Sequence, residues 1–178
     1  DKLEAIPGWR ASLSNAEMLE QLESVGAVIC AAGSGLAPAD KKLYALRDVT
    51  ATVESIPMIS ASIMSKKIAE GTASLVLDVK TGAGAFMKTY ADSLALAETM
   101  VGIGTAAGVN TVALITDMDA PLGRTAGNGL EVAESVEVLA GGGPADVVEL
   151  TVALAREMLT CAGIDADPAD VLASGRAT

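Results

Sequence analysis

The chain has 178 residues, enough for one globular domain, and is 51% hydrophobic, which excludes a disordered protein. Its formal net charge of −11 opposes contact with phosphate backbones, so we expect no nucleic-acid partner. The chain has no histidine, which excludes Ser-His and Cys-His nucleophiles and most zinc sites. Glycines and Asn110 interrupt its longest weakly charged run, so we expect no membrane partner.

Cysteine usage indicates the compartment. Cys30 and Cys161 are isolated residues in apolar surroundings, compatible with a disulfide but more typical of free thiols in a cytosolic protein. The first residues show no charged-then-apolar signal segment. We therefore predict two free thiols and a cytoplasmic location.

Capping residues, prolines and apolar spacing predict the elements of the first part of the chain. In chain order they are a helix from Ser14 or Asn15 to about Ser24, a short strand at Ala27–Cys30, a helix beginning at Pro38, and a helix beginning at Pro57 and ending near Gly71.

The second part of the chain has the pattern of an α/β protein. A buried strand at Ser74–Val79, a helix from about Tyr90 to Ala107 and a strand at Thr111–Thr116 form a βαβ unit, which implies parallel strands. The loop at 117–128 follows the second strand, at the edge where open α/β sheets bind ligands. Three further helices are predicted at about 129–140, at 145–161 and from Asp167-Pro168 onward.

Three polar residues on the two predicted proline-started helices form a candidate site. Ser62 and Lys66 are four residues apart and share one helix face, while Arg47 comes from the preceding helix. Their donors could hold a flat polar, anionic or heterocyclic group. On spacing alone, solvated surface residues are the commoner explanation.

Four long sequence words cover Leu36 to Val132 almost without a gap. They are LAPADKKLYALRDVTATVESIP, SIMSKK, LDVKTGAGAF and TDMDAPLGRTAGNGLEV, and the N-terminal DKLEAIPG belongs with them. In these words the chain resembles the pyrimidine nucleoside phosphorylase family, which includes thymidine phosphorylases. Members cleave a pyrimidine nucleoside with inorganic phosphate and release the base and a pentose 1-phosphate.

The resemblance implies a fold of two domains with the active site in the cleft between them. We expect part of a mixed or parallel sheet domain with helices, together with part of a small helical domain. Residues 1–37 and 71–178 would belong to an incomplete α/β domain, and residues 38–70 to a segment of the helical domain. Family members form homodimers through the helical domain, so we expect a homodimer.

The resemblance also implies roles for individual residues. Arg47, Ser62 and Lys66 would hold the pyrimidine, with Arg47 and Lys66 in catalytic roles because the departing base gathers negative charge. The pocket would be lined by Tyr44, Ile59 and Phe86. No phosphate-binding residue is expected in this chain, because the family's phosphate segment lies upstream of DKLEAIPG.

A monovalent cation such as potassium accompanies some family members, and no other cofactor is expected. The matching residues are Leu122 and Thr125, through backbone carbonyls, and Glu134. Such hard oxygen ligands suit the ion. Glu134 is equally compatible with an exposed acid on a helix.

We expect the phosphorolysis of thymidine to require a longer polypeptide and this chain alone to be inactive. Two other functions stay open, a base-binding module and an inert dimerising fragment. An anthranilate-type phosphoribosyltransferase relative is an alternative enzyme that shares the fold, but its diphosphate motif has no match here.

Overall fold

Helices and strands form an α/β fold over residues 2–31, 33 and 35–175, which this computed structural model describes. Within these residues, seven α-helices and a two-stranded parallel sheet confirm the predicted class and agree with a partial domain. The elements are η1 (Leu3–Ala5), α1 (Asn15–Val25), α2 (Pro38–Val49), α3 (Ile56–Ala69), β1 (Ser74–Thr81), α4 (Tyr90–Ala106), β2 (Asn110–Asp117), α5 (Asn128–Leu139), α6 (Ala145–Cys161) and α7 (Pro168–Ala173).

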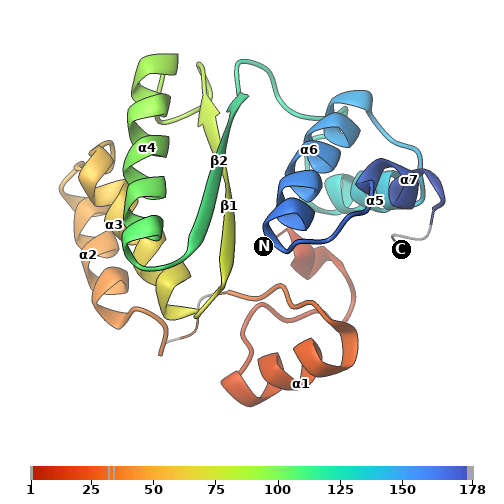
Figure 1. Cartoon of the computed structure of the whole chain (residues 1–178), viewed down its shortest axis with the longest axis horizontal. Coiled ribbons are helices and arrows are strands. Elements are labelled where there is room, and N and C mark those ends of the chain that lie inside the picture. Colours follow the sequence, from red (N-terminus) through yellow and green to blue (C-terminus); the bar gives the residue numbers. More distant parts are fainter. Residues whose placement is uncertain (1, 32, 34, 176–178) are drawn as a thin grey trace.

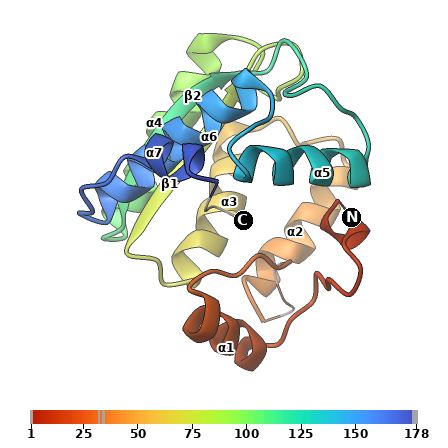
Figure 2. The same cartoon turned by 90° about the vertical axis from the view of Figure 1, so that its right-hand side faces the viewer.

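The sheet lies at the centre with helices on both of its faces (Figure 1). β1 and β2 pair in parallel, from Ser74 opposite Asn110 to Thr81 opposite Asp117. Helix α4, which connects them, packs on one face together with α3, and α6 covers the other face. Figure 2 shows η1 beside one end of α5, so the beginning of the chain closes against its later helices.

The hydrophobic core fills the space between the sheet, α3 and α4. Leu77 and Val79 alternate toward this face of β1, as strand geometry requires. The buried cluster is Met64, Leu77, Val79, Met87, Leu96, Ala97 and Met100. Because α3 contributes Met64 to this core, α3 packs with α4 and the sheet in this chain, while α2 packs against α3. The assignment of residues 38–70 to a separate domain stays a prediction.

The predicted strand at Ala27–Cys30 is wrong. These residues follow α1 without forming a strand. The Ala27 carbonyl accepts from Gln21 Nε2 at 3.3 Å, and the Ala31 N–H donates to the Ala11 carbonyl at 2.8 Å. A short apolar run becomes a strand only beside another strand, and within the described residues β1 and β2 pair only with each other. Cys30 and Cys161 are free thiols, as predicted. None of the described helices has the length and apolar character needed to cross a membrane.

The loops that follow the two strands are joined to each other. The Met118 N–H donates to the Thr81 carbonyl at 2.7 Å, and the Gly84 N–H donates to the Met118 carbonyl at 2.9 Å. The Ala83 N–H donates to Asp119 Oδ1 at 2.7 Å. We call these three hydrogen bonds the loop bridge. Gly84 permits this approach, since a Cβ there would lie 2.7 Å from the Met118 carbonyl oxygen.

Gly104 marks the closest approach of α4 to β2. A Cβ at this position would overlap the Thr111 side chain and lie 3.2 Å from Met64 Cε. We expect Gly104→Ala to lower the free energy of unfolding by about 1–3 kcal/mol, because the overpacked helix must move away from the sheet. Urea unfolding followed by circular dichroism measures the change.

Gly102 on the same helix is the matched control, since a Cβ there meets nothing within 4 Å. Gly102→Ala should stabilise the protein by about 0.5–1 kcal/mol, because alanine loses less backbone entropy on folding. If both substitutions changed stability in the same direction, the close packing at Gly104 would not be a constraint.

Candidate functional site

Helices α2 and α3 form an antiparallel hairpin that places the predicted site residues. Near the turn, Arg47 of α2 contacts Met58 in the first turn of α3. At the other end, Asp40 in the first turn of α2 contacts Lys66 near the end of α3. The hairpin therefore carries a cationic side chain at each end, and both face the neighbouring helix.

The Arg47 guanidinium is buried, with 4% of the residue exposed. Its Nε, Nη1 and Nη2 groups donate to the carbonyls of Thr52, Met58 and Val53 at 3.3, 3.1 and 2.5 Å. It also lies over the Tyr44 ring, 5.7 Å from the centroid. Arg47 therefore holds the α2–α3 turn in shape, a role that the sequence analysis did not predict, and two of its five N–H donors remain for other partners.

Lys66 and Ser62 lie side by side on α3, as their spacing implies. Lys66 Nζ donates to Ser62 Oγ at 3.1 Å and to Asp40 Oδ2 at 2.5 Å. Ser62 is buried, and the Lys66 side chain is 28% exposed. The ammonium is thus largely withdrawn from solvent and fixed between a hydroxyl and a carboxylate.

Asp40 is the residue of this cluster that the sequence analysis missed. Burial raises its pKa, but hydrogen bonds from Lys66 and Ser62 and the charges of Lys66 and Arg47 hold the pKa below its ordinary 3.8. A lowered pKa means that the stabilising contribution of this carboxylate is present above pH 3.8 and is lost as the pH falls through the lower value of the folded state. The structure therefore brings Ser62, Lys66 and Asp40 together at one end of the hairpin, while Arg47 lies near the turn at the other end.

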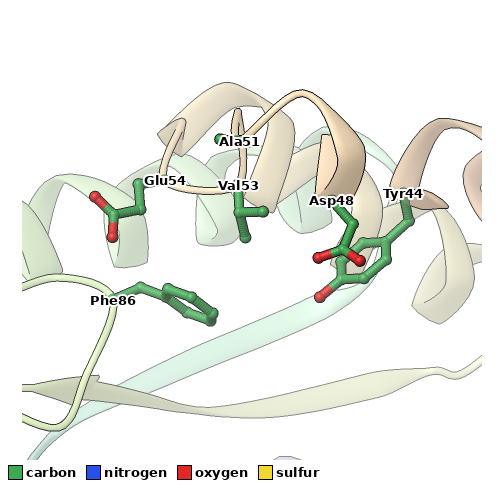
Figure 3. Close-up of a pocket in the computed structure, with 6 residues that line it drawn as sticks. All are labelled: Tyr44, Asp48, Ala51, Val53, Glu54 and Phe86. Carbon is green, nitrogen blue, oxygen red and sulfur yellow. The ribbon is translucent and has the colours of Figure 1, made fainter. Parts of the chain in front are cut away.

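A cavity of about 370 Å³ lies next to the turn of the hairpin (Figure 3). Its volume is in the range of small-molecule sites. Phe86 closes it from the β1–α4 loop, opposite the residues of the hairpin. The lining residues are Tyr44, Asp48, Ala51, Val53, Glu54 and Phe86.

The cavity includes some of the predicted pocket residues and not others. Tyr44 and Phe86 line it, whereas Ile59 packs against the hydrophobic core. Arg47 supports its wall through the Val53 carbonyl. Because the lining carries the carboxylates of Asp48 and Glu54 and no basic side chain, the cavity disfavours an anion such as phosphate.

The loop between β2 and α5 contains the residues predicted to bind a cation. Glu134 reaches it from α5, and its Oε1 accepts the Arg124 N–H at 3.0 Å. A Cβ at Gly123 would overlap the Glu134 carboxylate, so glycine allows this approach. Thr125 Oγ1 is buried and has no hydrogen-bond partner within the described part of the protein.

A monovalent cation at this loop stays a prediction. The described residues contain no group of three or more His, Cys, Asp or Glu side chains able to hold a metal ion. A cation here would therefore depend on backbone carbonyls, such as those predicted at Leu122 and Thr125, together with the Glu134 carboxylate.

Comparisons with known proteins show the family to which the chain belongs. Residues 1–178 match the family model described as glycosyl transferase family, a/b domain. The chain is 64% identical over 178 residues to the thymidine phosphorylase of Mycobacterium tuberculosis strain H37Rv, covering 99% of this chain and 42% of that protein. It is 52% identical over 162 residues to the pyrimidine-nucleoside phosphorylase of Staphylococcus aureus strain USA300, covering 91% and 37%.

The chain spans less than half the length of these curated relatives. Both similarities extend through the hairpin, the sheet and the loops described above, since they cover nearly the whole chain. They confirm the resemblance that the long sequence words indicate. The chain therefore belongs to the glycosyl transferase family that this a/b domain defines.

Proposed function

We propose that this chain carries the base-binding part of a pyrimidine nucleoside phosphorylase. The overall reaction is that of a pentosyltransferase, converting thymidine and phosphate into thymine and 2-deoxyribose 1-phosphate. The observation that carries the proposal is the α2–α3 hairpin, which holds Ser62, Lys66 and Asp40 at one end and Arg47 at the other end, beside the cavity that Tyr44 and Phe86 line. The similarity to phosphorylases over this same region supports it.

The donor groups of Arg47 and Lys66 suit a departing base. As the N-glycosidic bond breaks, its electron pair leaves with the base, and negative charge spreads over the ring nitrogen and carbonyl oxygens. Two guanidinium N–H groups of Arg47 and one ammonium hydrogen of Lys66 remain available in this structure. Donors fixed where charge develops lower the barrier to reaction.

Phosphate would bind elsewhere than in the cavity, whose carboxylates repel it. We propose that its ligands lie among the residues of the relatives that this chain does not match. Closure of the phosphate-binding part over the base would align the reactants and exclude water. On this basis we expect no turnover from the 178-residue chain alone.

We also propose that the protein forms a homodimer through the helical segment of residues 38–70. Apolar side chains stay exposed on α2, which supports a surface that another copy can cover. They are Leu43, Leu46 and Val49. The cytoplasmic location stays a prediction.

Potassium should stabilise the protein if the β2–α5 loop binds it. A ligand bound only by the folded state adds about 1.4 kcal/mol at ten times its Kd. We therefore expect a higher melting temperature in potassium chloride than in choline chloride, measured by differential scanning calorimetry. Glu134→Gln should remove this difference, because it keeps an acceptor for Arg124 but loses the charge.

Glu137→Gln, which removes a charge from the same helix, should keep the potassium effect. Glu137 accepts the Gly143 N–H at 3.3 Å and takes no part in the predicted cation site. Equal stabilisation by potassium in the Glu134→Gln protein would exclude a cation at this loop.

The proposed function is tested by release of thymine from thymidine, followed by ultraviolet absorbance with and without phosphate. We would assay this chain and a chimaera in which residues 1–178 replace the matching segment of the Mycobacterium tuberculosis thymidine phosphorylase. The expected result is phosphate-dependent release by the chimaera only.

Other outcomes would favour the alternatives. Thymidine binding without turnover, measured by calorimetry on the chimaera, would indicate a base-binding module. Concentration-dependent assembly without binding would indicate an inert dimerising fragment. Consumption of phosphoribosyl diphosphate with magnesium would indicate the phosphoribosyltransferase.

A further inference from the structure

Asp40 pairs with Lys66, and the roles proposed so far do not include Asp40. Its Oδ2 accepts a hydrogen bond from the Lys66 ammonium at 2.5 Å, at the end of the α2–α3 hairpin that lies away from the turn. The Asp40 side chain is only 13% exposed and that of Lys66 28% exposed, so this ion pair is partly desolvated. A part-buried pair with good geometry holds its members more firmly than a surface pair does.

Lysine needs such a partner in order to act at a fixed point. Its ammonium sits on a flexible four-carbon stem and is strongly hydrated, so an unpaired Lys66 would favour rotamers that reach solvent. Asp40 comes from a different helix and keeps the ammonium within 3.1 Å of Ser62 Oγ. The carboxylate thereby selects one rotamer out of many.

We propose that Asp40 is a positioning residue that holds the Lys66 ammonium beside Ser62, toward the base. It acts through Lys66 and does not itself touch the substrate. The proposal rests on the proposed function, in which Lys66 meets the departing base. The competing explanation is a salt bridge that only ties α2 to α3.

The first test measures the coupling without any substrate. Acetic anhydride acylates free amines faster than ammonium groups held in an ion pair, so the labelling of Lys66 relative to Lys67, read by peptide mass spectrometry on the full chain, reports how firmly the Lys66 ammonium is held. Asp40→Asn preserves size and an acceptor oxygen but removes the charge. We expect the Lys66 to Lys67 labelling ratio at pH 8 to rise about tenfold in Asp40→Asn and to return toward the parent value in Asp40→Glu.

The second test measures the consequence for catalysis in the chimaera. We expect Asp40→Asn to lower kcat for thymidine about 10-fold to 100-fold with little change in KM, and Asp40→Glu to recover part of the loss. Glu70→Gln is the matched control, since it removes the carboxylate that pairs with Lys67 at 3.0 Å on the same helix. It should leave kcat unchanged.

The outcomes separate the two proposals. An unchanged labelling ratio in Asp40→Asn overturns the positioning role, as does a raised ratio with an unchanged kcat in an active chimaera. Equal loss of kcat in Asp40→Asn and Asp40→Glu, with melting temperatures lowered alike, would show a salt bridge that only ties the helices. If the parent chimaera releases no thymine, the proposed function fails, while the labelling ratio still decides whether Asp40 controls Lys66.

Discussion

Lys66→Met in the chimaera is expected to lower kcat for thymidine phosphorolysis by about 10²-fold to 10³-fold. In the proposed function the ammonium would meet negative charge that exists mainly in the transition state, so its loss should affect turnover more than ground-state binding. KM should therefore change much less than kcat. Steady-state rates of thymine release over a range of thymidine concentrations, at saturating phosphate, give both constants.

Lys67→Met provides the control for Lys66→Met. Lys67 is the next residue of α3, but its ammonium pairs with Glu70 at the surface and not with Asp40. We expect its kcat to stay within about threefold of the parent value, as for other surface changes away from a site. Unchanged turnover in Lys66→Met, or equal losses in both variants, would contradict the assignment of Lys66 to the base.

Arg47→Met should lower the free energy of unfolding by about 3–5 kcal/mol. Three carbonyls, those of Thr52, Val53 and Met58, would lose a charged donor in a place with little access to water. The turn that forms one wall of the cavity would then relax, so thymidine binding should be lost as well. Urea unfolding of the 178-residue chain measures the first effect, and calorimetric titration of the chimaera with thymidine measures the second.

Two comparisons sharpen the Arg47 experiment. Arg47→Lys keeps the charge but cannot direct donors to three carbonyls, so we expect a loss of stability close to that of Arg47→Met. Arg10→Met removes an exposed arginine whose partner is Glu17 at 2.8 Å, and should cost about 1 kcal/mol or less. If Arg47→Met were as stable as Arg10→Met, the guanidinium would not be what holds the turn.

Local signals in the sequence predicted most of the fold. Prolines fix the dihedral angle that the first turn of a helix needs, and the helices predicted from Pro38 and Pro57 are α2 and α3. The strand, helix and strand of the βαβ unit were predicted from apolar periodicity, which differs between a strand and a helix. The contact between Ser62 and Lys66 is also local, because i and i+4 residues of a helix adjoin.

Long-range packing decided what the sequence could not show. Asp40 meets Lys66 only because α2 and α3 fold back on each other, although one signal existed, since both residues are equally far from Val53 along the chain. Ile59 has the same apolar character whether it faces a cavity or the core. Likewise the run at 27–30 has strand composition, but a strand requires a neighbour that no local pattern supplies.

The loop bridge has a thermodynamic consequence for the two ligand sites. It ties the β1–α4 loop, which carries Phe86, to the β2–α5 loop, which carries Leu122 and Thr125. A ligand that orders one loop reduces the entropy lost when the other loop is ordered. Cooperativity of this kind is mutual, so potassium bound at the predicted site would tighten thymidine binding by the same factor by which thymidine would tighten potassium binding. The ionic composition of the solution would thus set the affinity for the nucleoside without any contact between ion and base.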